Sequence, residues 1–393
     1  MSVTAEAVGQ AKPQIVRGEM PSSPYDIWLI GGAFALLCVG LIMVVSTSVS
    51  IAEHRDMTQL YYFKRQLFAA ALGIVGAGVL MRTPLVYFEQ WSTPLLFVAI
   101  AFLIAVLLPG LGHEVNGSMR WLGFGFFTIQ TSEPAKVAVA VYVAAYLVRH
   151  IKQVRTDFIG FIKPIGVITL IAGLLLLEPD FGTAVVLFTT VLGMLFLAGV
   201  PYVRFFFWGL AALSALAALS MLAPYRLARL MTFMDPWSDP FNTGFQLTQA
   251  LIAFGRGEWF GVGLGGSVEK LLYLPEAHTD FLLAVIAEEL GFAGVLLVIV
   301  LFSVVVARAF AIGRQAAALE RCFPALVAQG IGIWLGVQAI INMGVNMGVL
   351  PTKGLTLPML SFGGSGIVAN CVALALLLRV DWENRQMMRG LTV

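Results

Sequence analysis

The sequence predicts an all-α, polytopic integral membrane protein with about ten transmembrane helices and a long extracytoplasmic loop between the seventh and the eighth. Of its 393 residues, 59% are hydrophobic and only 12% are charged, and the mean hydropathy is +0.89. Apolar segments of about 18 residues or more recur along the chain, which is long enough to cross a bilayer as a helix. These segments are too long and too continuously apolar to be barrel strands.

The expected spans follow one another with short connections, apart from the one long loop. In chain order they are residues 26–48, 66–81, 91–109, 134–149, 159–177, 181–200, 203–222, 281–307, 323–347 and 359–379. Residues 1–24 lack the apolar core and the cleavage site of a signal peptide, so we expect a cytoplasmic N-terminal tail. Residues 25–380 then form a single ten-helix domain, and residues 381–393 a cytoplasmic C-terminal tail.

The distribution of Lys and Arg predicts the orientation. Outside the long loop, most of these residues fall on the side that holds both termini, which the positive-inside rule makes the cytoplasm. The long loop, residues 223–280, contains a semi-apolar part at 242–254 and a Gly-rich part at 255–266. This composition predicts a re-entrant or interfacial hairpin. The other main outward stretches are residues 50–65, 110–133 and 348–366.

Composition excludes several other classes of protein. The net charge is +2 and no basic run is present, so nothing indicates nucleic-acid binding. The four His and three Cys are scattered, without the spacing of a metal site or of a disulfide framework.

The stretch Leu274–Gly294 places a polar loop directly before an apolar helix. Asp280 follows Thr279 at the expected start of this helix, and two functions are open for it. It is either an N-cap, whose carboxylate suits the positive end of the helix dipole, or a general base that accepts a proton from a sugar hydroxyl. Nearby His278 is expected to form hydrogen bonds in the loop or contact substrate, since no second metal ligand lies at the right spacing.

Glu288 and Glu289 lie inside the hydrophobic part of the same helix. A carboxylate costs a few kcal/mol in the hydrocarbon region, so both need partners, an aqueous cavity or a function. We favour structural carboxylates bonded to neighbouring elements over a direct catalytic part. Asp235 and Trp237, in the turn-rich segment Met234–Pro240, are expected to support a rigid surface loop.

Three cations occupy short loops on the expected outer face: Arg120, Lys136 and Lys353. They are either snorkelling charges at the interface or a site for a phosphate or pyrophosphate, which Arg120 can bind in bidentate fashion. The run Ser361–Gly366 offers backbone amides to such an anion at the start of the last span.

An ordered set of motifs resembles the SEDS family, the shape, elongation, division and sporulation proteins of bacterial cell-wall synthesis. The motifs are FMDPW at 233–237, GFQLTQ at 244–249, GVGLG at 261–265, PEAHTDF at 275–281 and AEELG at 287–291. The resemblance extends from the first span to the last. The run Pro351–Thr356 is similar to the division branch of the family rather than the elongation branch. Met119, Phe362 and Gly366 depart from the residues usual in the family.

The resemblance implies a ten-helix glycosyltransferase that polymerises lipid II on the outer face of the bacterial inner membrane, at the division septum. It implies that Asp280 is the catalytic base and that Arg120, Lys136, Glu133, Lys353 and Ser361 contact substrate. It also implies partners: a class B penicillin-binding protein similar to FtsI, and division proteins similar to FtsQ, FtsL and FtsB. Whether a divalent cation, Mg or Mn, binds together with the pyrophosphate is left open.

The residues alone leave two other functions open. A flippase for a lipid-linked precursor would use Glu288, Glu289 or Lys353 as charges within a path and would not need Asp280 as a base. A non-catalytic scaffold for division proteins would tolerate neutralisation of the loop carboxylates.

Overall fold

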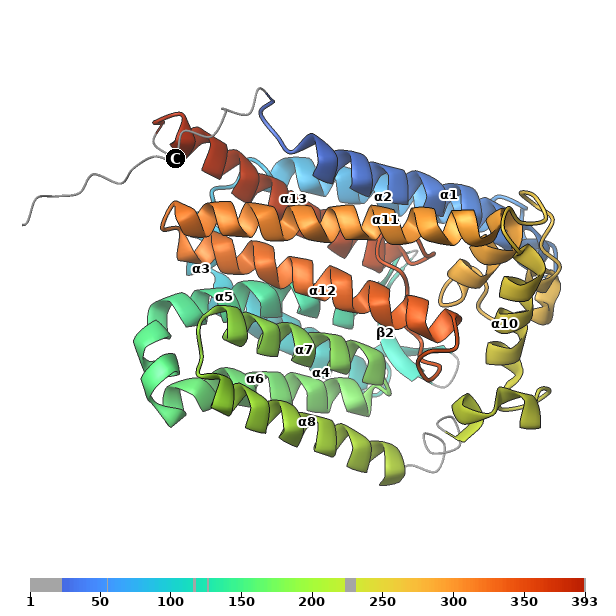
Figure 1. Cartoon of the computed structure of the whole chain (residues 1–393), viewed down its shortest axis with the longest axis horizontal. Helices are drawn as coiled ribbons and strands as arrows, with labels where there is room; N and C mark the ends of the chain where they lie inside the picture. Colours follow the sequence, from blue (N-terminus) through green and yellow to red (C-terminus); the bar gives the residue numbers. More distant parts are fainter. Residues whose placement is uncertain (1–22, 55, 116–117, 126, 223–230, 392–393) are drawn as a thin grey trace, which may run out of the picture.

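The computed structural model describes residues 23–54, 56–115, 118–125, 127–222 and 231–391, which form a helical bundle with its loops gathered at the two ends (Figure 1). The first half comprises α1 (Ile27–His54), α2 (Tyr61–Leu80), α3 (Leu85–Gln90), α4 (Ser92–Leu107), α5 (Ser132–Thr156), α6 (Phe158–Leu177), α7 (Phe181–Leu197) and α8 (Tyr202–Leu222). The second half comprises α10 (Phe245–Gly257), α11 (Leu282–Ala318), α12 (Cys322–Asn346) and α13 (Gly364–Met388).

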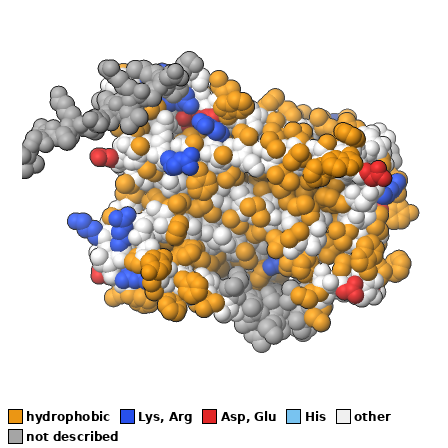
Figure 2. Space-filling view, in the orientation of Figure 1, with side chains coloured by type: hydrophobic (Ala, Val, Ile, Leu, Met, Phe, Trp, Pro, Cys, Tyr) orange, Lys and Arg blue, Asp and Glu red, His pale blue; other side chains and the backbone are white. Residues whose placement is uncertain are grey.

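Each predicted span coincides with one helix of the bundle. Within the described residues, α1, α2, α5, α6, α11, α12 and α13 are long and apolar enough to cross a membrane, and α4 and α7 are shorter apolar helices. On the face drawn in Figure 2, apolar side chains cover the middle of the molecule, whereas most of the visible Lys and Arg lie toward its left end, where Figure 1 shows the end of α13 and the connection between α5 and α6. This arrangement is that of a bundle surrounded by lipid along its length.

The centre of the bundle is α12, which packs against α11, α7, α5 and α13. Its Trp334 is among the largest side chains that are fully buried. Because α12 contacts so many helices, polar residues on its inner faces can bond to several loops at once.

A three-stranded antiparallel sheet was not predicted from the sequence. It consists of β1 (Gly112–Val115), β2 (Ser118–Phe124) and β3 (Phe127–Gln130), with β2 in the middle. Trp121 pairs with Gln130, and Leu122 with Ile129. The sheet folds the outward stretch between α4 and α5 into a hairpin-like unit that places Arg120 on its central strand.

The long loop has regular structure of its own. It contains a 3-10 turn at Pro236–Ser238, the helix α10 and a π-helical turn at Glu269–Tyr273. α10 packs against α11 and covers most of the semi-apolar part, residues 242–254, which the sequence predicts to lie in a re-entrant or interfacial hairpin.

α11 is interrupted inside its apolar part. Gly291 has φ 67° and ψ −163°, and an added Cβ there would lie 2.4 Å from the amide nitrogen of Gly261. The backbone of the loop fills the interruption: the amides of Val262 and Gly263 donate to the carbonyls of Glu288 and Glu289. The polar backbone of a broken helix is thereby satisfied by protein rather than left in lipid.

The last helix continues past residue 380, where the sequence predicts a tail, to Met388. Arg379 bonds Glu383 at 2.8 Å and Arg385 bonds Asp381 at 2.8 Å, both along α13, while Arg321 pairs with Glu383. These ion pairs neutralise the charges that lower the hydropathy after residue 380, so the helix extends further than an apolar window indicates.

Candidate functional site

Asp280 lies in the turn just before α11 and is half-buried. The carbonyl of Glu276 accepts from the amides of Thr279 and Phe281, and the Thr279 hydroxyl donates to the Glu276 carboxylate at 2.8 Å. Glu276 itself has φ 59°, a left-handed conformation that is strained for a residue other than glycine. The N-cap of α11 is Phe281 rather than Asp280, and the amide of Ala284 in the first turn donates to Asn346 Oδ1 at 3.1 Å.

The segment between α12 and α13, residues 347–363, is called the Lys353 loop, and it approaches the Asp280 carboxylate. A Cβ added at Gly354 would lie 3.0 Å from Asp280 Oδ2, so the absence of a side chain lets the two segments come together. Lys353 places its Nζ 3.4 Å from the centroid of the Phe181 ring, at the start of α7. The Lys353 ammonium is thus held by a cation–π contact with Phe181. The next residue in the chain, Gly354, is the one that lies against the Asp280 carboxylate.

Ser361 is buried, and its hydroxyl accepts from the amide of Leu357 at 3.0 Å. The amide of Phe362 donates to the carbonyl of His278 at 2.9 Å, and the amide of Gly363 donates to Gln66 Oε1 at 3.2 Å. Two of the amides that the sequence suggests for an anion are therefore already bonded to protein acceptors. This run locks the Lys353 loop onto α2 and onto the loop that carries Asp280.

His278 is 8% exposed, and its ring packs against two aromatic rings that also contact each other. Its ring centroid lies 5.1 Å from that of Tyr62 and 5.5 Å from that of Phe362. This packing, together with the hydrogen bond from the Phe362 amide to the His278 carbonyl, fixes the position of the loop that precedes Asp280.

Arg120 points from β2 to the connection between α6 and α7. Its Nε donates to the carbonyl of Glu178 at 3.1 Å, and its Nη2 donates to the carbonyl of Pro179. This connection leads into Phe181, which carries the Lys353 contact. Arg120 and Lys353 therefore bind opposite ends of one short turn.

The turn contains two buried carboxylates that the sequence reasoning missed, Glu178 and Asp180. Asp180 caps α7 by accepting from the Thr183 amide at 3.2 Å and from its hydroxyl at 2.9 Å. The pKa of Glu178 is raised to about 8, chiefly by burial and also by nearby Asp180, while the Thr131 hydroxyl bond and Arg120 oppose the rise. The available signal was two acidic residues flanking a proline between two apolar spans, where carboxylates are costly.

Lys136 is buried rather than snorkelling at the interface. Its Nζ donates to Glu133 Oε1 and to Gln338 Oε1, both at 2.9 Å, and lies 5.0 Å from the centroid of the Trp334 ring. Gln338 in turn donates to the carbonyl of Thr356 at 2.9 Å. The Lys136–Glu133 pair is therefore connected, through α12, to the Lys353 loop.

Glu288 and Glu289 are fully buried and bonded to the long loop. Glu288 pairs with Arg256 at 3.0 Å and also accepts from the Ser267 hydroxyl and the Val268 amide. Glu289 pairs with Lys270 at 2.7 Å and accepts from Ser46 of α1. Both carboxylates thus fasten the loop to the interrupted helix.

Asp235 and Trp237 lie away from these contacts. The Asp235 carbonyl accepts from Ser238, and Trp237 is 58% exposed. The carbonyl of the intervening Pro236 accepts from Thr248 at 3.2 Å, which ties this turn to α10.

The structure thus brings the loop of His278 and Asp280 against the loop of Lys353 and Ser361, through contacts at Phe362 and Gly354. Arg120, Lys136 and Glu133 are linked to these loops through the α6–α7 turn and α12. In Figure 1, β2 and α10 lie toward the same end of the bundle, opposite the C-terminal end. No group of three or more His, Cys, Asp or Glu side chains is placed to hold a metal ion within the described part of the chain.

Fold and site together define a polytopic helical membrane protein with a charged, loop-built site at one end of its bundle. The family model described as cell cycle protein, of the FtsW, RodA and SpoVE type, matches residues 27–386. The chain therefore belongs to this family, and the resemblance to SEDS proteins is confirmed.

Individual relatives cover nearly the whole chain. The probable peptidoglycan glycosyltransferase FtsW of Legionella pneumophila is 52% identical over 371 residues, covering 94% of each chain. Its namesake of Aromatoleum aromaticum is 54% identical over 369 residues, covering 93% of this chain and 90% of the relative.

Solved structures share the fold. A chain described under structural coordination of polymerization and crosslinking by a peptidoglycan synthase complex matches with a TM-score of 0.73 and 29% identity, covering 92% of this chain and 98% of that one. The rod shape determining protein RodA of Thermus thermophilus matches with a TM-score of 0.67 and 26% identity, covering 92% and 97%. The predicted fold class is thereby confirmed.

Proposed function

We propose that this chain is a peptidoglycan glycosyltransferase that joins lipid II into glycan strands on the outer face of the bacterial cytoplasmic membrane, during septal wall synthesis. The observation that carries the proposal is the approach of the Lys353 loop to the Asp280 carboxylate, with Arg120 bound to the adjoining α6–α7 turn. The loops of Asp280 and Lys353 and the turn that binds Arg120 adjoin one another, which supports a site with one base and two cations. Family membership and the names of the relatives support the same activity.

In this reaction Asp280 is the general base. The 4-hydroxyl of the acceptor sugar attacks the anomeric carbon of the donor, and Asp280 takes the hydroxyl proton. The bond from the anomeric carbon to the pyrophosphate oxygen breaks, and undecaprenyl pyrophosphate leaves with the electron pair. A single displacement inverts the anomeric carbon, so one positioned base is enough.

The leaving pyrophosphate needs positive charge near its developing negative charge. Lys353 and Arg120 are the cations of the site that adjoin the outer loops, whereas Lys136 is already paired with Glu133 and acts by holding the Lys353 loop through Gln338. A Mg²⁺ or Mn²⁺ ion bound to the pyrophosphate is part of the substrate in this scheme.

The contacts of Glu288 and Glu289 argue against the flippase alternative. Both side chains are fully buried and paired with Arg256 and Lys270, so they do not line an aqueous path. A class B penicillin-binding protein similar to FtsI, acting with other division membrane proteins, would receive the glycan strands for crosslinking.

The test is glycan polymerisation from purified lipid II by the wild type and by Asp280→Asn, each with a class B penicillin-binding partner whose transpeptidase is blocked. Loss of the base should lower the rate about 100-fold to 10,000-fold. Asp56→Asn, at an exposed aspartate between α1 and α2, is the matched control and should keep its activity. Equal polymer from wild type and Asp280→Asn would remove Asp280 as the base, and no polymer from the wild type would favour the flippase or the scaffold.

A further inference from the structure

Two asparagines of α12 contact the backbone of Asp280. Asn342 and Asn346 are one helical turn apart and are 1% and 0% exposed. The Nδ2 of each donates to the carbonyl oxygen of Asp280, and both distances are 2.9 Å. One carbonyl therefore receives two side-chain amides.

Asn346 occupies the place of a helical hydrogen bond. In a regular helix the amide of Ala284 would donate to the carbonyl of Asp280, four residues earlier. Here the Ala284 amide donates to Asn346 Oδ1 and to the carbonyl of Phe281, each at 3.1 Å, while Asn346 Nδ2 donates to the Asp280 carbonyl. The side chain is thus inserted between the two groups, and α11 begins at Leu282 with Asp280 outside it.

Asn342 connects this arrangement to the Lys353 loop. Its Nδ2 donates to the carbonyl of Leu355, two residues after Lys353, as well as to that of Asp280. Asn346 Nδ2 also donates to Asn342 Oδ1 at 3.2 Å, which orients the Asn342 amide. The pair therefore fixes the two loops relative to each other.

We propose that Asn342 and Asn346 are positioning residues for glycosyl transfer, which hold the Asp280 carboxylate in its reactive direction beside the Lys353 loop. The proposal rests on the function proposed above. Fixing the carbonyl of Asp280 fixes its peptide plane, which restricts the backbone torsions and therefore the position from which the side chain leaves the main chain. A misplacement of about 1 Å at a reacting group can cost about 100-fold in rate.

The test uses Asn342→Asp and Asn346→Asp, which keep the side-chain volume and one oxygen but lose the Nδ2 donors. kcat and KM for lipid II are measured with saturating partner from pH 5.5 to 9. We expect kcat to fall about 10-fold to 100-fold in both variants. KM should change less than about 2-fold in Asn346→Asp, because the bond from Asn342 to the Leu355 carbonyl still holds the Lys353 loop. The new carboxylate beside Asp280 should also move the acidic limb of the pH–kcat profile to higher pH.

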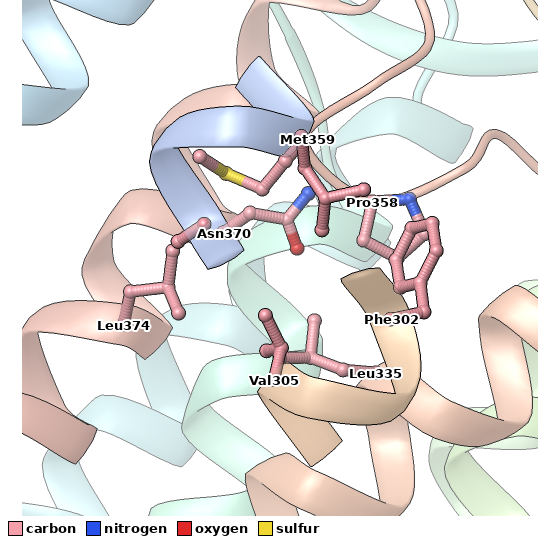
Figure 3. A pocket seen from close by; sticks show the side chains of 9 residues that line it. Phe302, Val305, Leu335, Pro358, Met359, Asn370 and Leu374 are labelled. Atoms are coloured by element: carbon pink, nitrogen blue, oxygen red, sulfur yellow. The ribbon is translucent and has the colours of Figure 1, made fainter. Parts of the chain in front are cut away.

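A buried asparagine elsewhere in the bundle provides the control. Asn370 of α13 is 4% exposed and lines a small cavity with Pro358, Met359, Phe302 and Leu374, among α1, α11 and α12 (Figure 3). Asn370→Asp places the same charge in the core but away from the Asp280 carbonyl, so its pH–kcat profile should match that of the wild type.

The outcomes separate the two proposals. Full activity of Asp280→Asn would overturn Asp280 as the base and this positioning role with it. An inactive Asp280→Asn combined with wild-type kcat in both asparagine variants would overturn the positioning role alone, as would a rise in KM at unchanged kcat. If an aspartate variant fails to fold, Asn346→Ser, which is neutral and smaller, is measured by the same kcat and KM split.

Discussion

At the scale of single residues, the buried carboxyl of Glu178 makes stability depend on pH. Its pKa is about 8 in the folded chain, mainly because of burial, against an ordinary value of 4.5. The folded chain therefore keeps a proton that the unfolded chain loses between pH 4.5 and 8. The free energy of unfolding should fall across this window by up to about 1.4 kcal/mol per pH unit and level off above it.

Glu178→Gln tests this dependence, because glutamine is neutral, similar in size and retains an oxygen for the Thr131 hydroxyl. The melting temperature of the wild type should decline more steeply than that of the variant between pH 5 and 8. Glu114→Gln, at an exposed glutamate of β1, should follow the wild type. Parallel curves for Glu178→Gln and the wild type would contradict the prediction.

Residue chemistry also shows what the sequence could predict of the site. Asp280, Lys353 and Arg120 could be selected as candidates from the sequence, because charges in outward loops of an apolar chain are conspicuous. The roles of Asn342 and Asn346 could not be recognised, because neutral amides inside a span carry no charge signal, and their partners are backbone carbonyls that only the fold brings near. The amides of Phe362 and Gly363 were expected to face an anion, but they bond to protein.

At the scale of elements, the pair of Lys270 and Glu289 joins the long loop to α11. Glu289 is fully buried and the Lys270 side chain is 7% exposed. Glu289→Gln would leave a buried ammonium without its counter-charge, which should lower the free energy of unfolding by about 3 kcal/mol or more. The double variant Lys270→Met with Glu289→Gln removes both charges and should recover most of that loss.

Thermal unfolding of the wild type, both single variants and the double variant forms a mutant cycle for this pair. Recovery in the double variant supports a buried ion pair that fastens the loop. Losses that simply add would mean that the two charges act independently.

The sequence predicted those helices that are long, continuous apolar segments. Each predicted span became a helix, but the sheet β1–β3 was missed because its strands are short and lack a regular alternation of apolar and polar residues. The extension of α13 to Met388 was missed because hydropathy counts Asp381 and Arg385 as polar, whereas the fold pairs them.

At the scale of the whole molecule, the start of α1 and the end of α13 lie together. Asp26 accepts from Arg308 Nε at 2.8 Å and lies 3.9 Å from Arg385. With the excess of Lys and Arg on that side, we expect both termini to face the cytoplasm. Protease should remove N-terminal and C-terminal tags from inverted membrane vesicles and leave both tags intact on spheroplasts; cleavage of either tag on spheroplasts would contradict this topology.

The interruption of α11 at Gly291 has a consequence for how the chain enters the membrane. Arg256 and Lys270 precede Glu288 and Glu289 in the chain, so synthesis completes the basic partners before the acidic helix emerges. α11 therefore depends on the preceding loop for insertion. Without that loop, α11 would expose to lipid two carboxylates without their basic partners and two backbone carbonyls without their hydrogen-bond donors. A fragment that begins at α11 lacks the residues that make this helix compatible with a bilayer.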